Sequence, residues 1–138
     1  MGTMPHALIG YAGSTLKAAK YYHDLFPGEP LTVLVDYFGK EITDTLEICK
    51  SFKRLVNNGN LFIRLDTHGG RYIEGLDIEK SYSILEKFNP SCIRTYRNEQ
   101  ELKWLVGAGV SAASIIFLRN ILNDNGFKKV KIIASSGF

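Results

Sequence analysis

The sequence predicts an α/β fold in which parallel strands alternate with helices. Three short runs rich in Val, Ile, Leu or Phe are bounded by turn residues, which is typical of buried strands: residues 31–35, 60–65 and 130–134. Stretches with apolar residues at helical spacing lie between these runs. A strand, a helix and a second strand in succession favour a right-handed crossover between parallel strands.

The first crossover is predicted to be one helix over residues 41–59. Its apolar positions fall on one face at helical spacing: Ile42, Leu46, Cys49, Phe52, Leu55 and Val56. Asp44 with Glu47 fits a capping box near its start. Asn58 followed by Gly59 is a suitable end for the helix.

The second crossover, over residues 67–129, is predicted to contain three helices: about 78–88, 99–106 and 112–124. Four apolar residues share one face of the first of these: Ile78, Tyr82, Leu85 and Phe88. Residues suited to capping or ending the other two stand at their boundaries: Asn98 with Glu101, Ser111, and Asn125 with Gly126. The mostly apolar third helix is expected to be covered on most sides. We also expect a helix over residues 7–25, closed by Pro27 and Gly28, and a short extra strand over residues 91–96.

Length and composition predict a single soluble domain, residues 1–138. Of the 138 residues, 45% are hydrophobic and 22% are charged, as in ordinary globular proteins. The formal charge of +3 comes from 17 basic and 14 acidic residues scattered along the chain, which argues against a nucleic-acid partner. No apolar run approaches the roughly 18 residues of a membrane span, and the first residues lack a signal-peptide pattern. We therefore expect a cytoplasmic protein with no membrane partner.

The two cysteines, Cys49 and Cys92, lie far apart in the sequence. Neither belongs to a CxxC motif or to a Cys/His spacing that would bind a metal. Both are therefore predicted to be reduced residues of the core, and the sequence predicts no metal site.

Polar and glycine-rich residues follow all three predicted strands. The first strand leads to Asp36, the second to residues 66–71 (DTHGGR), and the third to residues 135–138 (SSGF). Ligands of parallel α/β folds bind at the carboxyl ends of the strands. Each signal alone also has a plain structural reading, since an aspartate after a strand often caps a turn and a Ser-Gly turn is common. Agreement at three strand ends predicts that one edge of the sheet carries the chemistry.

The residue types at this edge indicate what they could bind. Asp36 and Asp66 could accept hydrogen bonds from sugar hydroxyls or help to hold Mg²⁺. The backbone amides of Ser136 and Gly137 could cradle a phosphate. Arg64 and Arg71 could pair with a carboxylate or a phosphate. His6 and His68 could transfer protons or accept a phosphoryl group. A histidine near a terminus is more often a solvent-exposed bystander, and the glycines before Arg71 could form only a turn.

Five segments of the chain, taken together, resemble nicotinate phosphoribosyltransferases and occur in that family's order: residues 2–8 (GTMPHAL), 31–36 (LTVLVD), 63–77 (IRLDTHGGRYIEGLD), 107–122 (GAGVSAASIIFLRNIL) and 131–138 (KIIASSGF). The resemblance implies part of a (β/α) barrel of the type II phosphoribosyltransferase kind. It also implies transfer of phosphoribosyl from phosphoribosyl pyrophosphate (PRPP) to nicotinate, giving nicotinate mononucleotide and pyrophosphate in NAD salvage. ATP hydrolysis would drive the reaction, Mg²⁺ and ATP would be the cofactors, and the protein would be a homo-oligomer.

The resemblance also implies roles for single residues. His6 matches the histidine that family enzymes phosphorylate from ATP, and Arg64 with Asp66 matches a pair at the pyridine and ribose site. Asp36 matches an aspartate near the substrates. The other implied positions are substrate-binding Thr67, His68 and Arg71 and phosphate-binding Ser135, Ser136 and Gly137. Many family members read Asp-Ser-Gly-Asp where this chain has Asp-Thr-His-Gly, so the second acidic residue is missing.

The resemblance covers only part of the family's barrel. The N-terminal domain and the later barrel strands have no counterpart in these 138 residues, so we expect a piece of a longer protein that is inactive alone. Such a piece would have open sheet edges, which favour self-association. Two alternatives stay open: an enzyme like quinolinate phosphoribosyltransferase, and a fragment that only binds phosphoribosyl compounds or is purely structural.

Overall fold

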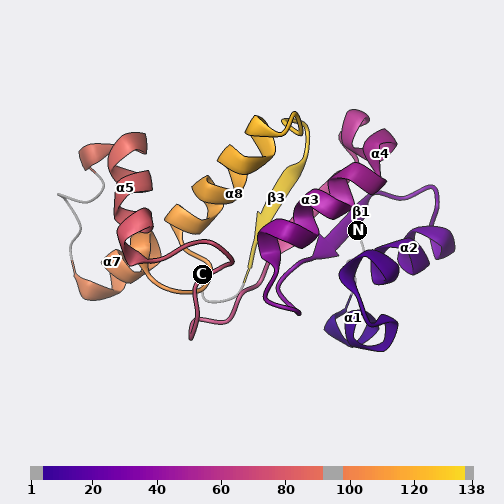
Figure 1. The fold of residues 1–138 in the computed structure, drawn as a ribbon, viewed down its shortest axis with the longest axis horizontal. Helices are drawn as coiled ribbons and strands as arrows, with labels where there is room; N and C mark the ends of the chain where they lie inside the picture. Colours follow the sequence, from indigo (N-terminus) through magenta and orange to yellow (C-terminus); the bar gives the residue numbers. More distant parts are fainter. Residues whose placement is uncertain (1–4, 92–97, 136–138) are drawn as a thin grey trace.

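Three parallel strands lie at the centre of the molecule, and helices pack against them (Figure 1). The computed structural model describes residues 5–91 and 98–135. Its elements are, in order, α1 (His6–Ala12), α2 (Thr15–Leu25), β1 (Leu31–Leu34), α3 (Glu41–Ser51), α4 (Lys53–Asn57), β2 (Leu61–Leu65), α5 (Ile78–Phe88), α7 (Glu99–Val106), α8 (Ala112–Asp124) and β3 (Lys131–Ala134).

The strand order is β1-β2-β3, and both neighbouring pairs are parallel. Val33 of β1 pairs with Ile63 of β2, which in turn pairs with Ile132 of β3. The three predicted strands and the α/β class with a parallel sheet are therefore confirmed. Three strands do not close a barrel, so the (β/α) barrel stays a prediction.

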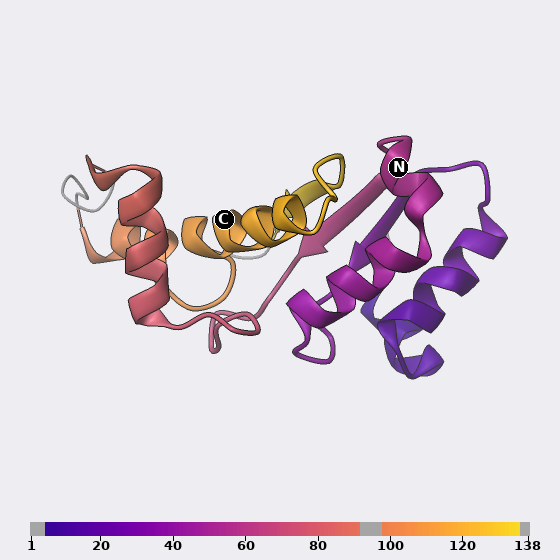
Figure 2. The same ribbon diagram turned by 45° about the horizontal axis from the view of Figure 1, so that its top comes forward.

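The helices α2, α3 and α8 form a row beside the sheet (Figure 2). α2 contacts β1 and α3, α3 contacts β2 and α8, and α8 contacts β3. Side chains of β2 alternate between the two faces of the sheet, so Leu61, Ile63 and Leu65 are buried in the core while Phe62 and Arg64 are half-buried. The second face of β2 therefore carries an arginine rather than core residues.

The single helix expected over residues 7–25 is wrong. The chain forms α1 and α2, because Gly13 ends α1 in a left-handed conformation (φ 83°) and Ser14 starts a new helix. The Ser14 hydroxyl accepts a hydrogen bond from the backbone N–H of Lys17 at 3.1 Å. Two short helices therefore precede β1.

The expected helix over residues 41–59 is also interrupted, because α3 ends at Ser51 and α4 begins after Phe52. The predicted capping box of Asp44 with Glu47 is wrong. The helix begins at Glu41, and Asp44 lies within it, where its carboxylate accepts a hydrogen bond from Thr15 Oγ1 at 2.7 Å. Burial raises the pKa of the Asp44 carboxyl, and this hydrogen bond only partly offsets the effect.

The three helices of the second crossover are confirmed as α5, α7 and α8. Asn98 caps α7 by accepting the Glu101 N–H at 2.9 Å, and Ser111 caps α8. The apolar face predicted for α5 is wrong at its ends, since Ile78 and Phe88 are 44% and 68% exposed. Among the described elements, α5 packs mainly against α7 and α8, in a small cluster at one end of the molecule (Figure 1).

The burial of α8 is lower than expected, since its residues 115–117 are only half-buried. Cys49 is a buried free thiol, as predicted, and burial raises its pKa to about 12. The strand expected over residues 91–96 lies, apart from Ser91, outside the described residues, as does Cys92. Among the helices described, none is long and apolar enough to cross a membrane.

Candidate functional site

His6 and Asp36 form a pair at the carboxyl end of β1. His6 is the first residue of α1, and its Nε2 lies 3.2 Å and 3.3 Å from the two carboxylate oxygens of Asp36. The His6 side chain is 44% exposed and that of Asp36 is 12% exposed. Through this contact the carboxylate can orient the imidazole ring. The structure thus brings together two predicted site residues that are 30 positions apart.

α1 contacts the loop after β1 through Gly10. A Cβ on Gly10 would lie 2.5 Å from the hydroxyl oxygen of Tyr37, so a larger residue there would displace the Tyr37 side chain. Tyr37 directly follows Asp36. The loop that carries the carboxylate therefore also contacts the helix that carries the imidazole.

Arg64, Asp66 and Ser135 form a second group, at the carboxyl ends of β2 and β3. Arg64 Nε donates to Ser135 Oγ at 2.9 Å, and its Nη2 lies 3.7 Å from Asp66 Oδ2. The Ser135 hydroxyl and backbone N–H both donate to the Leu65 carbonyl. The Arg64 and Asp66 side chains are 29% and 19% exposed, so both keep contact with solvent. Within residues 5–91 and 98–135, the two terminal nitrogens of Arg64 donate no hydrogen bond, so the group presents a cation with available donors beside a carboxylate.

A buried carboxylate that the sequence analysis missed links the loops after β1 and β2. Glu41, the first residue of α3, has no exposed surface. It accepts hydrogen bonds from Thr67 Oγ1 at 2.8 Å, from the Glu74 N–H at 3.1 Å and from both Nη atoms of Arg71 at 3.2 Å and 2.6 Å. Arg71 Nη2 also donates to the Asp36 carbonyl at 3.0 Å. One ion pair therefore ties together the backbone around Asp36 and the loop after β2.

Glu74 extends this network to the start of α3. Its carboxylate accepts hydrogen bonds from the Thr43 N–H at 2.7 Å and the Thr43 hydroxyl at 2.6 Å. Partial burial alone would raise the pKa of Glu74, but these hydrogen bonds, one from the Ile42 backbone and the charge of Lys40 lower it overall. The ionised carboxylate thus holds the loop of residues 66–74 to α3.

The turn after β2 also packs against the loop that precedes α8. The Gly109 N–H donates to the Arg71 carbonyl at 2.7 Å. Gly109 has φ 77°, and a Cβ there would lie 2.9 Å from the Cα of Gly69. Gly109 is therefore required for this close backbone approach.

The remaining predicted site residues differ in their surroundings. Thr67 is buried, and its hydroxyl is used by Glu41, while Arg71 is half-buried in the same network. His68 is exposed, and its Nδ1 accepts the Gly70 N–H at 2.9 Å. The structure therefore gives Thr67 and Arg71 a supporting position in the loops, and leaves His68 open to a ligand. The phosphate-binding positions predicted at Ser136 and Gly137 lie outside the described residues.

The sequence contains a signal for Glu41 that the helical apolar pattern obscured. Glu41, Thr45 and Ile48 are spaced as one helical face, and all three are buried. A glutamate at the start of a helix is also typical of a solvent-exposed residue whose negative charge interacts favourably with the helix dipole. Its burial depends on Arg71, thirty residues later in the chain.

The family resemblance implies Mg²⁺, but the carboxylates at the strand ends lie in separate groups and do not form a shared metal site. Across residues 5–91 and 98–135, no group of three or more His, Cys, Asp or Glu side chains could hold a metal ion. Asp36 is paired with His6 and Asp66 with Arg64. A magnesium ion here would need oxygen ligands from the phosphates of a substrate, as is common for this ion.

No family model, curated protein or solved structure matches this chain. The resemblance to nicotinate phosphoribosyltransferases therefore stays a prediction that rests on the five sequence segments.

Proposed function

We propose that the carboxyl ends of β1, β2 and β3 form part of a phosphoribosyl-transfer site that binds PRPP and nicotinate. The observation that supports it is that the His6–Asp36 pair and the group of Arg64, Asp66 and Ser135 lie at the same edge of the parallel sheet, at the carboxyl ends of its strands. The same residues lie in the five segments that resemble nicotinate phosphoribosyltransferases, which also supports the proposal. The product would be nicotinate mononucleotide, with pyrophosphate as the leaving group.

Arg64 is the residue suited to an anionic ring substituent. Its Nε is used by Ser135, but the outer nitrogens retain donors that can bind a carboxylate in a bidentate manner. In this proposal Arg64 orients the nicotinate carboxylate. Asp66, held beside it, accepts hydrogen bonds from the ribose hydroxyls. The nicotinate nitrogen then attacks the anomeric carbon as pyrophosphate leaves, and basic residues with substrate-bound Mg²⁺ neutralise the departing charge.

His6 is the residue suited to coupling ATP to this reaction. Asp36 contacts Nε2, and within the described part of the chain no group contacts Nδ1. Nδ1 is therefore the ring nitrogen that could take the γ-phosphoryl group of ATP, with ADP leaving. The negative charge of Asp36 would stabilise the phosphorylated imidazole of His6, and the contact at Nε2 would hold the ring in its orientation. The expected cytoplasmic location and homo-oligomeric state stay predictions.

Calorimetric titration of the chain with PRPP in the presence of Mg²⁺, and with nicotinate mononucleotide, tests the proposal. We expect Arg64→Ala to weaken binding of nicotinate mononucleotide about tenfold or more, because a hydrogen bond to a charged group contributes roughly 1.5–3 kcal/mol. Asp66→Asn should weaken both ligands. Arg54→Ala, at an exposed arginine of α4, is the matched control and should change neither.

Absence of binding by the unaltered chain at millimolar ligand would contradict the proposal and favour a purely structural role. Binding of quinolinate in preference to nicotinate would support the alternative of a quinolinate phosphoribosyltransferase-like site. Binding that Arg64→Ala and Asp66→Asn leave unchanged would show that the ligand occupies another part of the surface.

A further inference from the structure

The guanidinium of Arg71 uses all of its terminal hydrogen-bond donors inside the protein. Its Nη1 donates to Glu41 Oε1 at 3.2 Å and to the Tyr72 carbonyl at 3.1 Å. Its Nη2 donates to Glu41 Oε2 at 2.6 Å and to the Asp36 carbonyl at 3.0 Å. These bonds account for every N–H group of the two terminal nitrogens. A phosphate or carboxylate of a ligand that bound Arg71 in a bidentate manner would have to displace at least one of them.

The charge of Arg71 is also compensated within the protein. Glu41 has no exposed surface, and Arg71 is its ion-pair partner. Moving the guanidinium toward an anionic ligand would leave this buried carboxylate without a counter-charge, which is strongly unfavourable. The surroundings of Arg71 thus favour a role within the protein over the substrate-binding role that the family resemblance implies.

Arg71 joins the two ends of the loop between β1 and α3. Asp36 lies at the start of this loop and Glu41 at its end. The Asp36 carbonyl also accepts the Gly39 N–H at 3.2 Å, which makes residues 36–39 a turn. Gly39 has φ 70°, and a Cβ there would lie 3.8 Å from the guanidinium carbon of Arg71, so the turn lies against the guanidinium. Arg71 therefore holds the backbone of Asp36, whose carboxylate contacts His6 Nε2.

We infer that Arg71 is a positioning residue. Together with Glu41 it holds Asp36 so that the Asp36 carboxylate occupies His6 Nε2 and leaves Nδ1 as the nitrogen open to reaction. The inference rests on the proposed function for the role of His6, because there the imidazole accepts a phosphoryl group. Which nitrogen of His6 is open to reaction depends on neither PRPP nor nicotinate, so it can be measured separately.

The test uses phosphoramidate, a small reagent that phosphorylates histidine without ATP. The unprotonated ring nitrogen forms a bond to phosphorus as the P–N bond of the reagent breaks, and the reagent nitrogen leaves as ammonia with the protons that it already carries. An unconstrained imidazole gives mainly the Nε2 product, because Nδ1 lies next to the Cβ branch and is more hindered. The parent protein carries His23→Gln and His68→Gln, so that His6 is its only histidine. Phosphorus NMR distinguishes the two products.

The Nδ1 product should predominate in the parent protein, because Asp36 occupies Nε2. Arg71→Gln should lower the ratio of the Nδ1 product to the Nε2 product about tenfold, the factor that one hydrogen bond to a charged group supplies. Arg71→Lys keeps a charge opposite Glu41 and so protects the fold, but a single ammonium cannot replace the planar fork that spans the loop. It should also lower the ratio, in a protein whose circular dichroism matches that of the parent.

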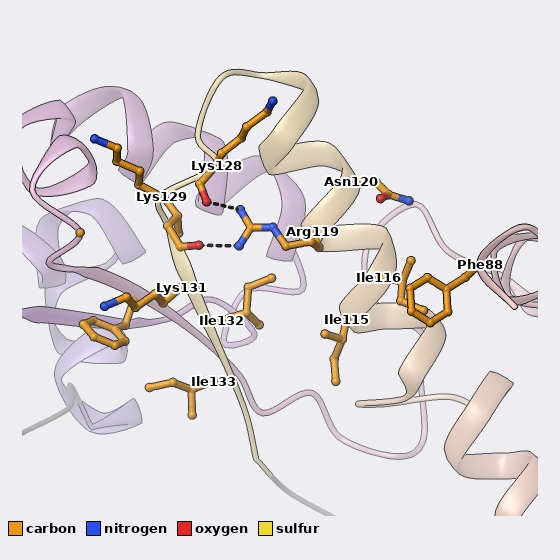
Figure 3. A pocket seen from close by; sticks show the side chains of 13 residues that line it. Phe88, Ile115, Ile116, Arg119, Asn120, Lys128, Lys129, Lys131, Ile132 and Ile133 are labelled. Atoms are coloured by element: carbon orange, nitrogen blue, oxygen red, sulfur yellow. Dashed lines mark hydrogen bonds between the residues drawn. The ribbon is translucent and has the colours of Figure 1, made fainter.

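Two control variants separate positioning from other effects. Thr43→Val removes the hydroxyl bond to Glu74 at 2.6 Å, and so weakens the same network on the side away from Asp36. Lys128→Gln removes one positive charge, as Arg71→Gln does, at the exposed rim of the apolar groove between β3 and α8. This groove has a volume of about 900 Å³, and no residue of the Glu41–Arg71 network lines it (Figure 3). Both controls should keep the product ratio of the parent protein.

A product ratio that Arg71→Gln and Arg71→Lys leave unchanged would overturn the inference, and weaker binding of PRPP by the same variants would then assign Arg71 to the substrate. A parent protein that gives mainly the Nε2 product would overturn it too. So would a ratio that Thr43→Val lowers as much as Arg71→Gln does, because general loosening of the loops would then explain the effect. If the chain binds no PRPP but the ratio responds as expected, the proposed function fails and the positioning role of Arg71 stands.

Discussion

Replacing Glu41 with alanine removes the carboxylate on which the loops after β1 and β2 converge. Four hydrogen bonds are lost, from Thr67, from the Glu74 N–H and from both outer nitrogens of Arg71. Thr67 is buried and the Glu74 N–H is left without its acceptor, and an unpaired buried donor costs roughly 1–3 kcal/mol. The Arg71 side chain is 38% exposed, so its charge regains water and adds less. Breaking a fully buried ion pair costs about 3–5 kcal/mol. For Glu41→Ala we expect a loss at the lower end of this range, about 3 kcal/mol of the free energy of unfolding.

Urea unfolding followed by circular dichroism measures this loss directly as a lower free energy of unfolding. In thermal unfolding, the same loss corresponds to a melting temperature lower by roughly 10 °C for a chain of this size. Glu86→Ala, at an exposed glutamate of α5, is the matched control and should stay within about 0.5 kcal/mol of the unaltered protein. A Glu41→Ala variant within 1 kcal/mol of the unaltered protein would refute the reasoning that this network holds the loops.

Three further predictions concern the pH dependence, the buried thiol and a helix cap. Glu74→Gln should lower the free energy of unfolding at pH 7, because the folded-state pKa of Glu74 lies below its unfolded value of about 4.3. The stability difference between the variant and the unaltered protein should vanish as the pH falls through the folded-state pKa. A stability difference that does not change with pH would contradict this. In a Cys92→Ser variant, Cys49 should react with a thiol reagent at pH 8 only after urea unfolding, because its thiol is buried and its pKa is raised to about 12. Rapid reaction of Cys49 in the folded protein would count against its burial. Ser111→Ala should destabilise the protein by about 1 kcal/mol in urea unfolding by removing the cap of α8, whereas the exposed Ser83→Ala should be neutral; equal effects would argue against the cap.

The strands and most helices of the second crossover could be predicted because their signals are local. An apolar run between turn residues is enough to indicate a buried strand, and β2 at Leu61–Leu65 lies where the run predicted it. The caps Asn98 and Ser111 form hydrogen bonds only three residues away, so the sequence contains both partners in one window. Local chemistry of this kind does not depend on the tertiary structure.

The positions that were wrong or missed depend on contacts between distant segments. Asp44 fitted a capping box, but Thr15 of the preceding helix binds its carboxylate within α3. Phe88 fitted the apolar face of α5, but no described element covers it. Glu41 is buried because Arg71 neutralises it from the next loop, and no local pattern reports such a pairing. The candidate site was therefore predictable in its place, at the carboxyl ends of the strands, but not in the ion pair that supports it.

The measurement that tests the central claim most directly is backbone chemical-shift mapping by NMR while PRPP and Mg²⁺ are added to the labelled chain. If the strand ends form the binding site, the largest shifts will occur at the amides of His6, Asp36, Arg64, Asp66 and Ser135, and they will saturate together. Absence of shifts at millimolar ligand, or shifts confined to the groove between β3 and α8, would contradict the account.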